Sequence, residues 1–167
     1  ILGVTGAMGT NASTANRGVD LGFNVGDVNQ PNNVAVLASN GVTVAQSFYV
    51  TPNTNSATRT VGVTGGGSAT FNNQFYMDGT LTVDAGSAAT DMVTLSGNMT
   101  NTGAISKTNA GILVLSASNN HSGGTTLGQG TLRLGNANAL GTGGLTVNAG
   151  TLSSSSSTNQ TVTNNVT

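Results

Sequence analysis

The stretch Gln129-Gly130-Thr131-Leu132-Arg133-Leu134 indicates the fold class, because its pattern of a glycine followed by alternating leucines recurs along the chain. Its counterparts are Asp78-Gly79-Thr80-Leu81-Thr82-Val83, Ala110-Gly111-Ile112-Leu113-Val114-Leu115 and Ala149-Gly150-Thr151-Leu152-Ser153-Ser154. The last three copies follow one another at a nearly constant interval, with their glycines at positions 111, 130 and 150. Self-similarity at such a fixed period is typical of solenoids, in which each repeat packs only against its neighbours.

The composition favours strands over helices as the repeated unit. The chain has no Glu, a single Lys and 25 Gly among 167 residues, whereas helical repeats need long runs of good helix formers. Leucine and valine alternate with small or polar neighbours, which points one set toward a narrow core and the other toward water. We therefore predict an all-β, single-stranded parallel β-solenoid of roughly eight coils of about 20 residues, with Gly and Asn at the corners. Asn and Thr can also stack on themselves from coil to coil.

The two halves of the chain differ in regularity. Residues 1–77 carry both prolines and all six aromatic residues, while residues 78–167 hold the regular repeats. We expect a soft boundary near residue 77, between less regular solenoid coils with aromatic loops and regular coils.

Charge and cysteine content exclude several classes of partner. Only 5% of residues are charged, the formal net charge is -1, and Arg17, Arg59, Lys107 and Arg133 form no basic stripe, so we expect no nucleic-acid binding. Apolar runs are too short to span a bilayer, so we expect no membrane insertion of this segment. Cysteine is absent, so neither disulfides nor thiolate metal sites contribute.

Four motifs follow one another in order within residues 102–152: Lys107-Thr108-Asn109-Ala110-Gly111-Ile112-Leu113-Val114-Leu115-Ser116, Asn119-Asn120-His121-Ser122-Gly123-Gly124-Thr125-Thr126-Leu127, Gly130-Thr131-Leu132-Arg133-Leu134-Gly135 and Ala139-Leu140-Gly141-Thr142-Gly143-Gly144-Leu145-Thr146-Val147. This segment closely resembles the passenger-associated transport repeat of bacterial autotransporters, which are type V secreted proteins. The resemblance implies a right-handed β-helix passenger, on the surface of or secreted by a Gram-negative bacterium. It implies a role of the repeat in folding and export of the passenger, and it does not imply a catalytic activity.

The polar residues do not form the sequence patterns typical of catalytic or metal-binding sites. His121 beside Ser122 lacks any local signature of a nucleophile, so we interpret it as a turn histidine. The spacing of the five aspartates does not superpose them in coils of about 20 residues, which argues against a paired-carboxylate or lyase site. We expect no catalytic residue, no cofactor and no metal site.

The aromatic residues Phe48, Tyr49, Phe75 and Tyr76 are the best candidates for contact with a ligand or partner, because exposed rings can stack on sugars or on another protein. The alternative, which we favour, is that the two Phe rings stack inside wider coils. The Tyr pair then remains at the surface.

The sequence predicts an uncapped strand at each end of the chain. Ile1 and Val4 belong to an apolar stretch at the start, and Val162 and Val166 continue the strand pattern at the other end. Unpaired strand edges accept further strands, so these four residues are candidates for end-to-end assembly, or for continuation of a longer chain. The leading functional hypothesis is a structural, adhesin-like extracellular solenoid that can assemble end to end into a filament, with a glycan or host surface as a further partner. The alternative is a carbohydrate-binding or polysaccharide-degrading β-helix protein.

Overall fold

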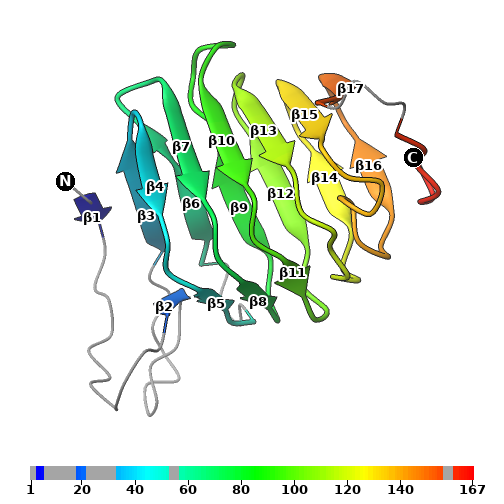
Figure 1. Cartoon of the computed structure of the whole chain (residues 1–167), viewed down its shortest axis with the longest axis horizontal. Coiled ribbons are helices and arrows are strands. Elements are labelled where there is room, and N and C mark those ends of the chain that lie inside the picture. Colours follow the sequence, from blue (N-terminus) through cyan, green and yellow to red (C-terminus); the bar gives the residue numbers. More distant parts are fainter. Residues whose placement is uncertain (1–2, 6–17, 22–32, 53–56, 156–159) are drawn as a thin grey trace.

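The computed structural model describes residues 3–5, 18–21, 33–52, 57–155 and 160–167. All regular structure in these residues is β-strand, so none of the described segments is a helix that could cross a membrane. The strands form three sheets, each running along the long axis of the molecule (Figure 1). The prediction of an all-β parallel solenoid is confirmed.

The three sheets are named A, B and C. In spatial order, sheet A contains β1 (Gly3–Thr5), β3 (Val34–Ser39), β6 (Arg59–Thr64), β9 (Leu81–Asp84), β12 (Ile105–Thr108), β14 (Thr125–Leu127) and β16 (Leu145–Val147). Sheet C contains β17 (Thr151–Ser154), β15 (Thr131–Leu134), β13 (Ile112–Leu115), β10 (Met92–Leu95), β7 (Ser68–Phe71) and β4 (Val42–Val44). Sheet B contains β11 (Met99–Thr100), β8 (Phe75–Met77), β5 (Phe48–Val50) and β2 (Val19–Leu21).

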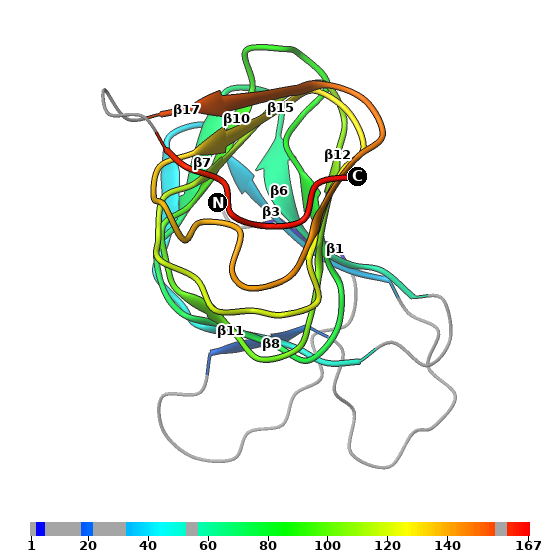
Figure 2. The same ribbon diagram turned by 90° about the vertical axis from the view of Figure 1, so that its right-hand side faces the viewer.

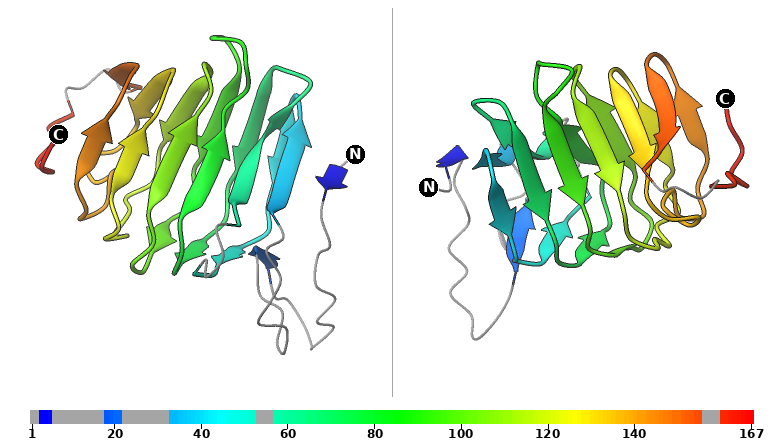
Figure 3. Two further views of the ribbon diagram at one scale, coloured as in Figure 1. Left: turned by 180° about the vertical axis from the view of Figure 1, so that it is seen from behind. Right: turned by 45° about the horizontal axis from the view of Figure 1, so that its top comes forward.

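From β2 onward the chain winds through the sheets in the order B, A, C and, as far as β11, adds one strand to each sheet per turn. Successive strands within a sheet are then parallel: Ile105 pairs with Thr125, and Thr125 pairs with Leu145. Seen along the axis, the turns superpose in one closed outline with sheet C on one side and β8 and β11 on another (Figure 2). Two further views show the same row of strands from behind and from above (Figure 3).

The predicted count of eight coils is not confirmed. Sheet A has six parallel strands, β3 to β16, which correspond to about five turns. The early turns are longer than predicted, because Val19 pairs with Phe48, and Phe48 pairs with Phe75. The turns become shorter in the region of the Gly-Thr-Leu repeats, where Ile105 pairs with Thr125.

Columns of apolar side chains fill the interior. Each column contains one residue from every turn, as in Val93, Leu113 and Leu132, which are all 0% exposed. Burying one such leucine contributes about 1.5–3 kcal/mol relative to an exposed one, before losses of conformational entropy. The alternation of buried and partly exposed positions confirms the inward and outward sets predicted from the sequence.

The recurring glycine of each repeat lies where the backbones of neighbouring turns are in close contact. A Cβ atom on Gly111 would lie 1.9 Å from the carbonyl oxygen of Ala85, and one on Gly130 would lie 2.4 Å from the carbonyl oxygen of Gly111. Gly130 and Gly150 also have positive φ, at 71° and 111°. The period seen in the sequence is therefore enforced both by the turn and by backbone contact between coils.

Hydroxyl side chains line the outer face of sheet A. The paired outward positions of successive strands are Thr60, Thr82, Ser106, Thr126 and Thr146. At the last turn the hydroxyls of Thr146 and Thr167 lie 3.2 Å apart. The predicted stacking of Thr between coils is thus present in this row.

Sheet B ends at β11, and Asn119 carries its hydrogen bonding into the next turns. The backbone N–H of Met99 donates to Asn119 Oδ1 at 2.9 Å, and Asn119 Nδ2 donates to the carbonyl oxygen of Ala139 at 2.7 Å. Asn119 is 5% exposed. Its amide therefore supplies an acceptor and a donor where a further strand would otherwise pair.

Candidate functional site

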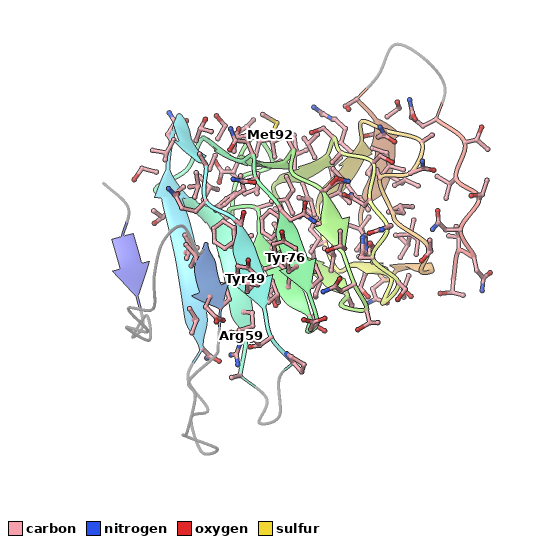
Figure 4. All side chains as sticks on the ribbon, turned by 60° about the horizontal axis from the view of Figure 1, so that its bottom comes forward. Tyr49, Arg59, Tyr76 and Met92 are labelled. Carbon is pink, nitrogen blue, oxygen red and sulfur yellow. The ribbon has the colours of Figure 1, made fainter. Side chains whose placement is uncertain are left out.

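The exposed aromatic site is a stack of two tyrosines on the outer face of sheet B. Tyr49 of β5 and Tyr76 of β8 pair in register, with ring centroids 4.7 Å apart and an interplanar angle of 13°. Tyr49 is 37% exposed. The two labelled rings lie side by side (Figure 4). Parallel in-register strands place like side chains one above the other, so the recurrence of a Phe-Tyr pair one turn later in the sequence produces the stack.

A second aromatic stack lies directly inside this one. Phe48 and Phe75 are 0% exposed, with centroids 5.0 Å apart and an interplanar angle of 11°, and Phe71 meets Phe48 edge-on at 5.7 Å. The favoured interpretation of the phenylalanines is therefore confirmed. Their alternative role as direct contacts is corrected, since buried rings offer no surface to a ligand. They instead fix the backbone that carries the tyrosines.

The chemistry open to the tyrosine pair depends on the ring surface that is left exposed. Each ring stacks on the other with one face, and the in-register neighbours Thr100 and Asp20 lie on the opposite sides of Tyr76 and Tyr49. The exposed part of a tyrosine ring can contact a sugar, and the phenol hydroxyl can donate or accept a hydrogen bond. Beside Thr100, Gln74 Nε2 lies 3.4 Å from the Thr100 hydroxyl.

The N-terminal edge of sheet A is paired within the chain. Val4 of β1 pairs antiparallel with Val36 of β3, so β3 does not present an open edge. β1 is then the outermost described strand of sheet A. Ile1 lies outside the described residues, and assembly through Ile1 and Val4 stays a prediction.

At the C-terminal end of the solenoid, the backbone of β16 in sheet A is paired with residues 165–167, but apolar side chains at this end are exposed. The N–H of Leu145 donates to Asn165 at 2.8 Å, the N–H of Val147 donates to Thr167 at 2.8 Å, and Val166 forms a parallel bridge with Leu145. Val166 is nevertheless 52% exposed, whereas Val162 is partly buried against the core. The role of Val162 and Val166 in assembly stays a prediction.

Leu152 belongs to the same end face and was not among the predicted site residues. It pairs with Leu132 in an inward-facing column, yet it is 38% exposed because no described strand lies beyond β17. Its position in the fourth Gly-Thr-Leu copy was the available signal. Leu152 and Val166 together are called the end face below.

His121 lies in the non-strand segment between β13 and β14, as its interpretation as a turn histidine predicted, but its side chain points into the core. Its side chain is 0% exposed, and burial lowers its pKa to about 4. Nε2 lies 3.5 Å from the Thr125 hydroxyl, and Nδ1 has no hydrogen-bond partner among the described residues. The turn interpretation did not specify that the ring is buried, because burial depends on how the neighbouring turns pack against this segment.

Lys107 is a second buried polar residue that the sequence did not identify. It is 0% exposed and stands between Val83 and Leu127 in an inward column. Its Nζ donates to the carbonyl oxygens of Thr108 at 3.0 Å and of Asn109 at 2.8 Å. Burial lowers the pKa of Lys107 to about 8, against an opposing effect of Asp84.

The aspartates Asp84 and Asp91 cap corners. Asp91 accepts N–H bonds from Ala88 at 2.9 Å and Gly67 at 2.8 Å, and these backbone hydrogen bonds lower its pKa. Asp84 accepts hydrogen bonds from Gly86 and Asn109. The described residues contain no group of three His, Cys, Asp or Glu side chains placed to hold a metal ion.

Comparison with known proteins gives two findings. A family model described as the passenger-associated-transport-repeat matches residues 105–134 and 127–153, within and just beyond the segment 102–152 that carries the motifs. The adhesin BmaC autotransporter of Brucella suis biovar 1 (strain 1330) is 42% identical over 69 residues, which are 41% of this chain and 2% of that protein. The chain thus matches a small part of that relative's length. No solved structure gives a significant match.

Proposed function

We propose that this chain is a structural, adhesin-like stretch of an autotransporter passenger, because residues 105–153 match the passenger-associated-transport-repeat and 69 residues are 42% identical to an adhesin autotransporter. It is exposed at the surface of a Gram-negative bacterium or secreted from it, and its turns wind right-handedly. The observation that carries the proposal is the uninterrupted parallel pairing of sheets A and C, from β3 and β4 to β16 and β17. A rod of this kind holds other parts of a long chain at a distance from the cell.

A structural role is further supported by how the polar residues are used. The carboxylates of Asp84 and Asp91 accept hydrogen bonds at corners, and the ammonium of Lys107 donates to backbone carbonyls. Groups engaged in this way stabilise the turns and are not free to transfer protons to a substrate. We therefore propose that the segment is not an enzyme.

A second candidate function is glycan contact at the tyrosine pair, favoured by the exposure of Tyr49 and by its stacking on Tyr76. The two candidates differ in what removal of the rings does. Serine at both positions removes the stacking surface, while the phenylalanine stack inside continues to support β5 and β8.

Adherence of bacteria that display the whole passenger tests both candidates. In the structural case, Tyr49→Ser with Tyr76→Ser leaves adherence and display unchanged, whereas Leu113→Asp in the core removes display. Loss of adherence with normal display in the double Tyr variant would assign the site to ligand binding. Unchanged display of the Leu113→Asp variant would contradict the structural role.

End-to-end association of two copies is proposed through the end face. The supporting observation is that Leu152 and Val166 occupy inward-facing register positions yet are 38% and 52% exposed. Sedimentation velocity over a range of concentrations should show association that Leu152→Asp abolishes. A wild-type protein that stays monomeric at the highest concentration would overturn this proposal.

A further inference from the structure

His121 lies between two turns of the solenoid, inside the segment that connects β13 and β14. Its carbonyl oxygen accepts the N–H of Thr142 from the following turn at 2.9 Å, and the adjacent N–H of Asn120 donates to Met99 of the preceding turn at 3.0 Å. Asn119 and His121 face inward, while Asn120 and Ser122 are exposed. The imidazole is thus part of the packing that joins the transport-repeat turns.

The surroundings of His121 suit a neutral imidazole and lack hydrogen-bond acceptors for a protonated one. An imidazolium has two N–H donors, whereas the described residues provide one distant acceptor, the Thr125 hydroxyl at 3.5 Å from Nε2. The backbone of the following turn packs against the other nitrogen, since a Cβ on Gly141 would lie 2.8 Å from Nδ1. A buried donor without an acceptor is strongly unfavourable, so the folded turn selects the neutral form.

Charged groups around the ring do not offset this cost. The neighbouring segments 97–106, 116–130 and 135–150 contain no Asp, Glu, Lys or Arg. Lys107, which is inward-facing on β12, has the same charge sign as an imidazolium and would not stabilise it. Arg133 is on the outward set of β15, and Asp84 and Asp91 cap the β9–β10 corner.

We propose that His121 is an acid-sensitive latch: its protonation releases the segments 119–124 and 138–144 from each other, while the turns before β11 stay paired. Local release is possible because each solenoid turn contacts only its neighbours, so one contact between turns can open while more distant turns stay paired.

The direction of the pH effect follows from linkage. Burial lowers the pKa of His121 to about 4, while the opened turn has the ordinary value of about 6.5. The open state therefore binds more protons between these values, and closure weakens as pH falls through this window. At pH ~4.5 the opening equilibrium should be on the order of 50–100-fold more favourable than at pH ~7.5.

Hydrogen exchange of the whole chain, followed by mass spectrometry and corrected for intrinsic rates, tests the latch. Amides of 119–124 and 138–144 should lose protection by that factor between pH ~7.5 and ~4.5, while β6 and β9 keep theirs. His121→Phe, which keeps a buried ring but cannot titrate, should abolish the loss. The same loss in His121→Phe, or uniform loss along the chain, would overturn the proposal.

A measurement on the unmodified chain avoids dependence on the variant's folding. The ring carbon signals of His121 in an NMR titration should show a midpoint well below that of a free histidine. A midpoint of about 6.5 in a fully protected, folded protein would show that the ring titrates without opening, and the latch would be refuted.

Discussion

Removing the Asn119 amide is expected to destabilise the solenoid more than any other change of a single polar group near it. Asn119→Ala leaves two buried backbone groups unpaired: the N–H of Met99, now at 2.9 Å from Oδ1, and the carbonyl of Ala139, now at 2.7 Å from Nδ2. Each unsatisfied buried group costs about 1–3 kcal/mol, so with two such groups the free energy of unfolding should fall by about 2–6 kcal/mol.

Urea unfolding followed by circular dichroism measures this loss, with the midpoint and the slope compared between variants. Asn120→Ala is the matched control, because Asn120 is adjacent but exposed, and it should change stability by less than about 0.5 kcal/mol. Asn119→Asp keeps the acceptor for Met99 and loses the donor to Ala139, so it should also destabilise. Equal stability of the Asn119→Ala and Asn120→Ala proteins would refute the reasoning.

Three further outcomes can be measured in the same unfolding assay. Phe75→Ala should cost about 3–5 kcal/mol because the buried ring leaves a cavity, whereas Tyr76→Ala at the surface should cost about 1 kcal/mol; similar losses would contradict the layered stacks. Lys107 has a pKa of about 8 in the folded chain, because of burial, and of about 10.4 in the unfolded chain. The unfolded state therefore binds more protons between these two values, so the free energy of unfolding should rise with pH from ~8 to ~10.4. Lys107→Met should flatten this rise. Gly111→Ala should prevent folding, because its Cβ would lie 1.9 Å from the carbonyl oxygen of Ala85 in the preceding turn. The control Gly41→Ala has open space around its Cβ and should cost about 1–2 kcal/mol, because Gly41 has a positive φ. A folded Gly111→Ala protein would contradict this packing.

The regular part of the fold could be predicted because its signal is local and repeated. The Gly-Thr-Leu copies became β9, β13, β15 and β17, and Leu113, Leu132 and Leu152 pair in the order their spacing predicted. The number of turns could not be predicted from the same signal. Strand pairing fixes which residues face each other, but the corners between strands tolerate different lengths, and the early turns use that freedom.

The polar core was missed for a different reason. Lys107 has the same parity as Ile105 in β12, so the alternation alone would have placed it inward. Its charge argued for the surface, and the carbonyl oxygens of Thr108 and Asn109 that receive its ammonium depend on a corner the sequence does not specify. The tyrosine pair was easier to identify, since two adjacent aromatic residues recur and pair in register.

The paired residues Ile105, Thr125 and Leu145 are equally spaced in the sequence, so the late turns are equivalent in length and can replace one another. Duplication or loss of one whole unit there leaves the remaining ladders aligned, and changes the length of the rod by about 4.8 Å. The same event between Phe48 and Phe75 would displace the aromatic columns, because the neighbouring steps differ in length. Growth and shrinkage of such a chain during evolution should therefore concentrate in its late turns.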